Sequence, residues 1–177
     1  MIYHPRGFSF VELFVLRHGE AGNRLPPGGR DTERPLTMAG KEEIAEIARA
    51  LFRLDVKFDF VATSPLKRAL QTAEIVSKQL KVKKGNFEEW AELKPEGSRQ
   101  ELYRKLAQFK PESSVLVVGH EPYLSAMISE LVFSSTAGSI VLKKGGFAKI
   151  GLTSLQPKAK GELRWLLTPK HLRKIGK

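Results

Sequence analysis

Two histidines that follow short apolar segments are the residues in this sequence best suited to chemistry. His18 follows the largely apolar run 11–17, and His120 follows the run 113–119. Such runs are typical of buried strands, and the glycine beside each histidine marks a turn. Ligands of open α/β sheets bind at the carboxyl ends of strands, so both imidazoles are predicted to lie at a substrate site. A histidine found there alone is more often an ordinary core or surface residue.

Two arginines accompany the histidines and favour the chemical interpretation. Arg17 directly precedes His18, and Arg68 lies in the predicted first helical turn after the strand-like segment 59–63. Guanidinium groups bind phosphoryl oxygens bidentately, and a neutral imidazole beside them can attack the phosphorus. We expect the arginines to supply the charge stabilisation that Mg²⁺ supplies elsewhere, so no metal and no cofactor is expected.

Four motifs, in this order, resemble the histidine phosphatase superfamily. They are Arg17-His18-Gly19, D-x-x-R-P-L-T-x-x-G at 31–40, S-P-x-x-R-x-x-x-T-A at 64–73 and Gly119-His120. The second motif and the short chain look most like SixA-type phosphohistidine phosphatases, over about residues 11–155. The resemblance implies that His18 is the nucleophile, that Arg17 and Arg68 clamp the phosphoryl group, and that His120 contacts it.

The resemblance defines the general acid and the remaining motif residues less closely. Larger superfamily members take a carboxylate from the segment after the third strand, where Glu92 is the candidate here, near Glu88, Glu89 and Glu96. SixA-type members have no clear equivalent. We expect Ser64, Thr72 and the 31–40 motif, including Asp31 and Arg34, to shape turns and packing. Glu20 either orients a ring, binds a cation or is a solvated surface residue.

Composition limits the partners of this chain of 177 residues, which carries a formal charge of +11 and no cysteine. Disulfides, thiolate catalysis and cysteine metal sites are therefore excluded. A positive field attracts phosphorylated or acidic partners. The cations are not interleaved with aromatic residues and no helix-turn-helix pattern occurs, so a solvated lysine-rich surface is favoured over nucleic-acid binding. No apolar run is long enough to span a membrane, and we expect a cytoplasmic protein.

Alternating strands and helices predict one α/β domain over residues 1–177, a three-layer α/β/α sandwich with a mainly parallel sheet, phosphoglycerate-mutase-like by the resemblance. Residues 1–9 are a lead-in and 169–177 a basic tail. Helices are predicted over 37–54 with Thr37 as N-cap, from Ser64 and Pro65 to about 80, over 98–109 from a capping box, and from Pro122 onward. Further strands are predicted over 82–88, 139–142, 147–155 and 162–167, with a possible hairpin across 144–146.

We expect a phosphatase that forms a phosphohistidine intermediate and dephosphorylates phosphohistidine on a partner protein, such as a histidine phosphotransfer domain. An open basic site with little inserted chain suits such a substrate. A small-molecule phosphomonoesterase or phosphoglycerate-mutase-like enzyme is the alternative, which a lid and a placed Glu92 would favour. A non-catalytic phosphate- or nucleic-acid-binding module is a distant third, because mere binding does not require His18 between the arginines.

Overall fold

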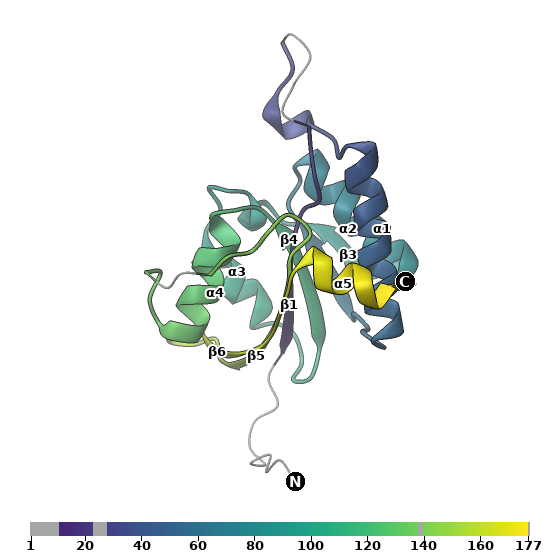
Figure 1. The fold of residues 1–177 in the computed structure, drawn as a ribbon. Helices are drawn as coiled ribbons and strands as arrows, with labels where there is room; N and C mark the ends of the chain where they lie inside the picture. Colours follow the sequence, from purple (N-terminus) through teal and green to yellow (C-terminus); the bar gives the residue numbers. More distant parts are fainter. Residues whose placement is uncertain (1–10, 23–27, 138–139, 177) are drawn as a thin grey trace.

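A six-stranded sheet organises the computed structural model, which describes residues 11–22, 28–137 and 140–176. The strand order is β3-β2-β4-β1-β5-β6, with β1 and β4 at the centre (Figure 1). The first four strands are parallel, and β5 and β6 join in antiparallel pairs. Their bounds are β1 Glu12–Arg17, β2 Phe60–Thr63, β3 Phe87–Glu89, β4 Ser114–Gly119, β5 Phe147–Ser154 and β6 Lys160–Leu167. The predicted mainly parallel sheet is confirmed.

Helices cover both faces of this sheet, as the three-layer prediction required. Helices α1 (Met38–Arg53), α2 (Lys67–Gln79) and α5 (Pro169–Gly176) lie on one face, and α3 (Arg99–Leu106) and α4 (Tyr123–Phe133) on the other (Figure 1). Successive side chains of a strand point to opposite faces. Accordingly, Leu13 and Val15 of β1 pack with α3 and α4, whereas Phe14 and Leu16 pack with α1, α2 and α5.

Two of the three helix caps that the sequence predicts are present. The Oγ1 atom of Thr37 accepts a hydrogen bond from the amide of Gly40 at 3.0 Å, so α1 begins where expected. Ser98 caps α3 by accepting from the amide of Glu101 at 3.3 Å. The Glu101 carboxylate pairs with Arg104 instead of returning to Ser98, so only half of the capping box forms.

Three predictions along the chain are wrong. Helix α2 begins at Lys67 after Leu66, so Ser64 is not its N-cap and Pro65 is not its first residue. The strand expected over 82–88 is confined to β3, after a 3-10 turn at Lys84–Asn86. Residues 140–142 form no strand, and residue 139 lies outside the described residues.

The segment predicted as a hairpin at 144–146 closes onto the end of β1 instead. The amide of Gly145 donates to the carbonyl oxygens of Arg17 and His18 at 3.1 and 3.2 Å, and the amide of Arg17 donates to Gly146 at 3.1 Å. Gly145 has a φ of +68°, a conformation that glycine adopts without strain. This turn therefore belongs to the surroundings of His18.

The basic tail predicted from residue 169 forms helix α5, which packs against α1. Leu172 is fully buried between them, and Arg173 pairs with Glu43 and Glu46. The lead-in 1–9 lies outside the described residues. In the part of the chain that the structure describes, no helix has the length and apolar character needed to span a bilayer.

Candidate active site

The two histidines meet because the strands that carry them are neighbours. In the parallel register of β1 and β4, Arg17 lies opposite Gly119, so His18 and His120 leave the sheet side by side. The amide of His18 donates to the carbonyl oxygen of Gly119 at 3.1 Å, and the two ring centroids are 5.0 Å apart. The predicted meeting of these imidazoles is confirmed.

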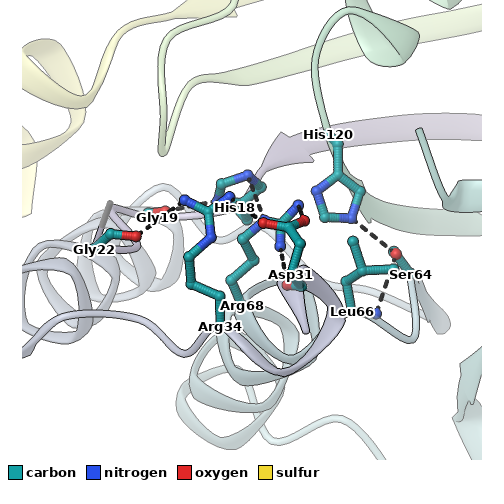
Figure 2. A network of polar contacts seen from close by, with 9 residues as sticks. All are labelled: His18, Gly19, Gly22, Asp31, Arg34, Ser64, Leu66, Arg68 and His120. Carbon is teal, nitrogen blue, oxygen red and sulfur yellow. Dashed lines mark hydrogen bonds and ion pairs between the residues drawn. The ribbon is translucent and has the colours of Figure 1, made fainter. Parts of the chain in front are cut away.

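Arg68 reaches the same place from the first turn of α2. Its Nε atom donates to Nε2 of His18 at 3.3 Å, and both side chains are buried (Figure 2). One turn later, the hydroxyl of Thr72 donates to the Arg68 carbonyl at 2.7 Å and accepts from the amide of Gly19 at 3.1 Å. Thr72 thus ties the glycine after His18 to the helix that carries Arg68, in keeping with the packing role predicted for it.

The hydrogen bonds of His18 define its tautomer. Its Nδ1 atom lies 2.7 Å from the carbonyl oxygen of Gly19, which can only accept, so Nδ1 carries the proton. The Nε2 atom therefore keeps its lone pair, in agreement with the bond it accepts from Arg68. Burial, together with the charges of Arg68 and Arg17 and against the opposing hydrogen bond to Gly19, lowers the pKa of His18 to about 4. The ring is neutral at pH 7, as a nucleophile requires.

His120 is held by a residue predicted only to shape a turn. Its Nε2 atom lies 2.8 Å from Oγ of Ser64, which also accepts from the amide of Leu66 at 3.3 Å (Figure 2). Ser64 can then donate its hydroxyl proton to Nε2, which leaves the proton of His120 on Nδ1. Burial, followed by the neighbouring His18 and Arg68, lowers the pKa of His120 to about 3, so this ring is neutral as well.

Among the residues that the structure describes, Nδ1 of His120 and Nε of Arg17 are buried without a hydrogen-bond partner. The Nη1 atom of Arg17 donates to the carbonyl oxygen of Leu142 at 2.9 Å. A buried polar group left unpaired costs about 1–3 kcal/mol, so such atoms usually have a partner or a ligand. Both atoms can donate their N–H protons to the oxygens of a phosphoryl group.

Asp31 is a site residue that the sequence reasoning missed. Its Oδ2 atom lies 3.1 Å from NH2 of Arg68, its Oδ1 lies 2.8 Å from NH2 of Arg34, and its carbonyl oxygen accepts from NH1 of Arg68 at 3.0 Å (Figure 2). Burial alone would raise the pKa of Asp31, but the two guanidinium groups outweigh it and lower the pKa. The carboxylate is therefore ionised and orients Arg68. The D-x-x-R spacing was the available signal, because it places Asp31 and Arg34 one turn apart.

Glu92, the candidate general acid, lies in a 3-10 turn at Ala91–Leu93 and pairs with Lys105 of α3 at 2.8 Å. Burial alone would raise the pKa of Glu92, but the hydrogen bond and charge of Lys105 outweigh it, and the pKa is lowered. Among the described residues, no hydrogen bond or ion pair joins the side chain of Glu92 to His18, Arg68 or His120.

The carboxylate of Glu20 forms an ion pair with Nζ of Lys144 at 2.7 Å. Within residues 11–22, 28–137 and 140–176, no three His, Asp or Glu side chains are grouped to hold a metal ion.

Comparison with known proteins agrees with this geometry. The model of the histidine phosphatase superfamily (branch 1) matches residues 13–109. An uncharacterized protein of Picosynechococcus sp. is 33% identical over 167 residues, which cover 92% of this chain and 99% of that protein. The phosphohistidine phosphatase SixA of Escherichia coli K12 is 28% identical over 165 residues, or 92% of this chain and 97% of that protein.

Solved structures extend the likeness to the fold. A structure of the protein histidine phosphatase SixA complexed with tungstate superimposes with a TM-score of 0.78 at 29% identity, covering 91% of this chain and 99% of that one. Structures of a phosphoserine phosphatase, below 25% identity, share the fold alone. The match spans β1 to α3 in the family model and nearly the whole chain in SixA. The chain therefore belongs to the histidine phosphatase superfamily.

Proposed function

We propose that this chain removes the phosphoryl group of a phosphohistidine on a partner protein, by way of a phosphorylated His18. One observation carries the proposal: His18 is neutral, its Nδ1 proton is committed to Gly19, and its Nε2 lone pair faces the guanidinium of Arg68. The likeness to SixA proteins over more than nine-tenths of the chain supports the substrate class.

In the first step, Nε2 of His18 attacks the phosphorus, and the bond from phosphorus to the substrate nitrogen breaks. The electron pair of that bond returns to the substrate imidazole. As Nε2 forms its new bond it stops accepting from the Nε–H of Arg68, which donates to a phosphoryl oxygen instead. Arg17 and His120 donate to the other oxygens through Nε and Nδ1, two buried atoms that have no partner among the described residues.

In the second step, water attacks the phosphorus of the phosphorylated His18, and the bond from phosphorus to Nε2 breaks. Inorganic phosphate leaves, and a proton of the water goes to phosphate or to solvent. Because Nδ1 keeps its proton against Gly19, His18 departs as neutral imidazole. The same donors stabilise the charge on the phosphoryl oxygens in both steps.

The carboxylates near the site favour a phosphohistidine over an alkyl phosphate ester. An alkoxide leaves only when a proton reaches it as the bond breaks, and a missing acid costs about 10²–10⁴ in rate. Asp31 and Glu92 both have lowered pKa values and are paired with cations, so neither holds a proton at pH 7. A phosphohistidine whose other ring nitrogen is protonated leaves as neutral imidazole and needs no such acid.

A substrate panel tests the proposal. Rates are measured on a phosphohistidine-carrying phosphotransfer protein, p-nitrophenyl phosphate and 3-phosphoglycerate, with EDTA present. We expect them to fall in that order, with an acid-labile phosphoryl group on the wild type that is absent from His18→Ala. Glu92→Gln should leave the rate of phosphohistidine hydrolysis within about threefold of the wild type, since a general acid speeds only the departure of poor leaving groups.

Other outcomes would contradict the proposal. Faster turnover of 3-phosphoglycerate than of the phosphohistidine protein, with collapse in Glu92→Gln, would assign the chain to small-molecule phosphomonoesterases. Near wild-type turnover in His18→Ala would exclude the phosphohistidine intermediate. Loss of all activity in EDTA, restored by Mg²⁺, would contradict charge stabilisation by the arginines.

A further inference from the structure

A basic groove adjoins the candidate active site on the side of Arg17. It has a volume of about 690 Å³ and is lined by the turn before β5 and by helix α5. Helix α5 in turn packs on α1 (Figure 1). Glu43 of α1 is its one carboxylate lining residue among the described residues. Its cationic lining residues are Arg17, Lys143, Lys144, Lys170, Arg173 and Lys174.

Only some of these charges are neutralised by neighbours. Lys144 pairs with Glu20 at 2.7 Å, and Arg173 pairs with Glu43 and Glu46. Lys143, Lys170 and Lys174 are exposed and form no ion pair within the described part of the chain. The groove therefore keeps an uncompensated positive charge directly beside the phosphoryl site, which attracts anionic groups.

The walls of the groove are fixed by the fold. Lys170, Arg173 and Lys174 have the i, i+3, i+4 spacing that places side chains on one helix face, and the buried Leu172 holds that helix on α1. On the other wall, Lys143 and Lys144 precede Gly145, whose amide is bonded to the carbonyl oxygens of Arg17 and His18. The position of these cations relative to His18 is therefore preset.

We propose that this groove binds an acidic segment of the protein that carries the phosphohistidine. The proposal rests on the proposed function and names a recognition feature of its substrate. The phosphoryl group occupies the site at His18, so the groove is free for further anions of the same partner. Its unpaired cations lie on both walls, and those on α5 are spread over about one helical turn of ~6 Å. Several carboxylates of a polypeptide can meet these cations at once, whereas a single small anion meets few of them.

Removal of the unpaired charges tests the groove. The variant Lys143→Gln, Lys170→Gln, Lys174→Gln is compared with the wild type on the phosphohistidine protein and on p-nitrophenyl phosphate. We expect the ratio of kcat/KM for the protein over the ester to fall about tenfold, mainly through a higher KM for the protein. A change of this size corresponds to the loss of three exposed ion pairs between the groove and the substrate. Raising NaCl from 50 to 500 mM should lower this ratio in the wild type and change it less in the variant.

A matched control removes three lysines from the opposite edge of the sheet. Helix α2 starts at the carboxyl end of β2 and runs back, so Lys78, Lys83 and Lys84 lie near the amino ends of the strands, where they are exposed. The variant Lys78→Gln, Lys83→Gln, Lys84→Gln loses the same formal charge, and its ratio should match that of the wild type. A tenfold fall in this control as well would overturn the groove in favour of a general effect of net charge.

Direct binding separates the groove from the proposed function. A fluorescent peptide of eight glutamates should bind the wild type in 50 mM NaCl and bind the groove variant about tenfold more weakly. This result is expected even if no phosphohistidine is hydrolysed, in which case only the proposed function fails. The proposal would be overturned if the groove variant lost kcat/KM equally on both substrates or on neither. It would also be overturned if the groove bound inorganic triphosphate or an oligonucleotide in preference to the peptide.

Discussion

The guanidinium of Arg68 has two partners with different tasks. Its Nε–H faces Nε2 of His18, and its other nitrogens are held by Asp31. An anchored donor is most useful when charge grows on the phosphoryl oxygens in the transition state. Arg68→Ala should therefore lower kcat by about 10²–10³ and change KM less, as for the loss of an oxyanion donor. Steady-state kinetics with p-nitrophenyl phosphate measure both constants.

Asp31→Asn keeps the shape of the side chain and removes its charge, and it distinguishes anchoring from proton transfer. If the carboxylate only holds Arg68, kcat should fall about tenfold, less than in Arg68→Ala, because one charge-assisted bond is weakened. The acid limb of the pH profile should not move. A loss as large as that of His18→Ala, together with a shifted limb, would mean that Asp31 exchanges a proton with the substrate.

For single residues, the sequence predicted which side chains the candidate site brings together better than it predicted their supports. Arg17, His18, Arg68 and His120 were expected to converge because each lies at a strand end or in the helical turn that follows one. Asp31 was assigned to the scaffold, because its contact with Arg68 depends on how a loop folds back across 37 residues of sequence. The spacing of residues within one segment does not predict how a loop folds back onto a distant helix.

At the scale of elements, Thr72 joins the end of β1 to α2. Thr72→Val keeps the volume but leaves the buried amide of Gly19 without its acceptor. The free energy of unfolding should fall by about 1–3 kcal/mol, the cost of an unpaired buried donor. Turnover should fall too, since His18 and Arg68 lose their common support. Urea unfolding and kinetics measure these effects, and Thr72→Ser should restore both.

The strand predicted over 139–142 shows why elements near the site are harder to predict. The run Ile140-Val141-Leu142 has strand-forming side chains, and Leu142 is buried. Its carbonyl oxygen, however, accepts from Arg17, and the next residues turn onto the end of β1. The guanidinium of Arg17 thus takes the carbonyl oxygen that a neighbouring strand would otherwise bond. The periodicity of the side chains does not show that such a donor is nearby.

At the scale of the whole molecule, the two neutral histidines make stability depend on pH. The pKa of His18 is about 4 and that of His120 about 3 in the folded protein, and both are near 6.5 when unfolded. Below pH 6.5 the unfolded chain binds protons that the folded chain does not, so stability is lost as pH falls. Between pH 7 and pH 5 the loss should be about 2 kcal/mol for each histidine.

Urea unfolding at the two pH values measures this loss. His120→Gln removes one of the two titrating groups while keeping a hydrogen-bonding side chain, so the loss between pH 7 and pH 5 should be about 2 kcal/mol smaller than in the wild type. An unchanged loss would mean that other groups carry the pH dependence.

The central place of β1 has a consequence for how the molecule is made. The strand that precedes His18 is synthesised long before its sheet neighbours, because β4 and β5 both begin more than a hundred residues later. A nascent chain can bury β1 only after Phe147 and the strand it starts have left the exit tunnel. Until then Phe14 and Leu16 lack part of their native cover and are surfaces that a chaperone can bind. The candidate nucleophile His18 is thus synthesised well before the strands that complete its surroundings.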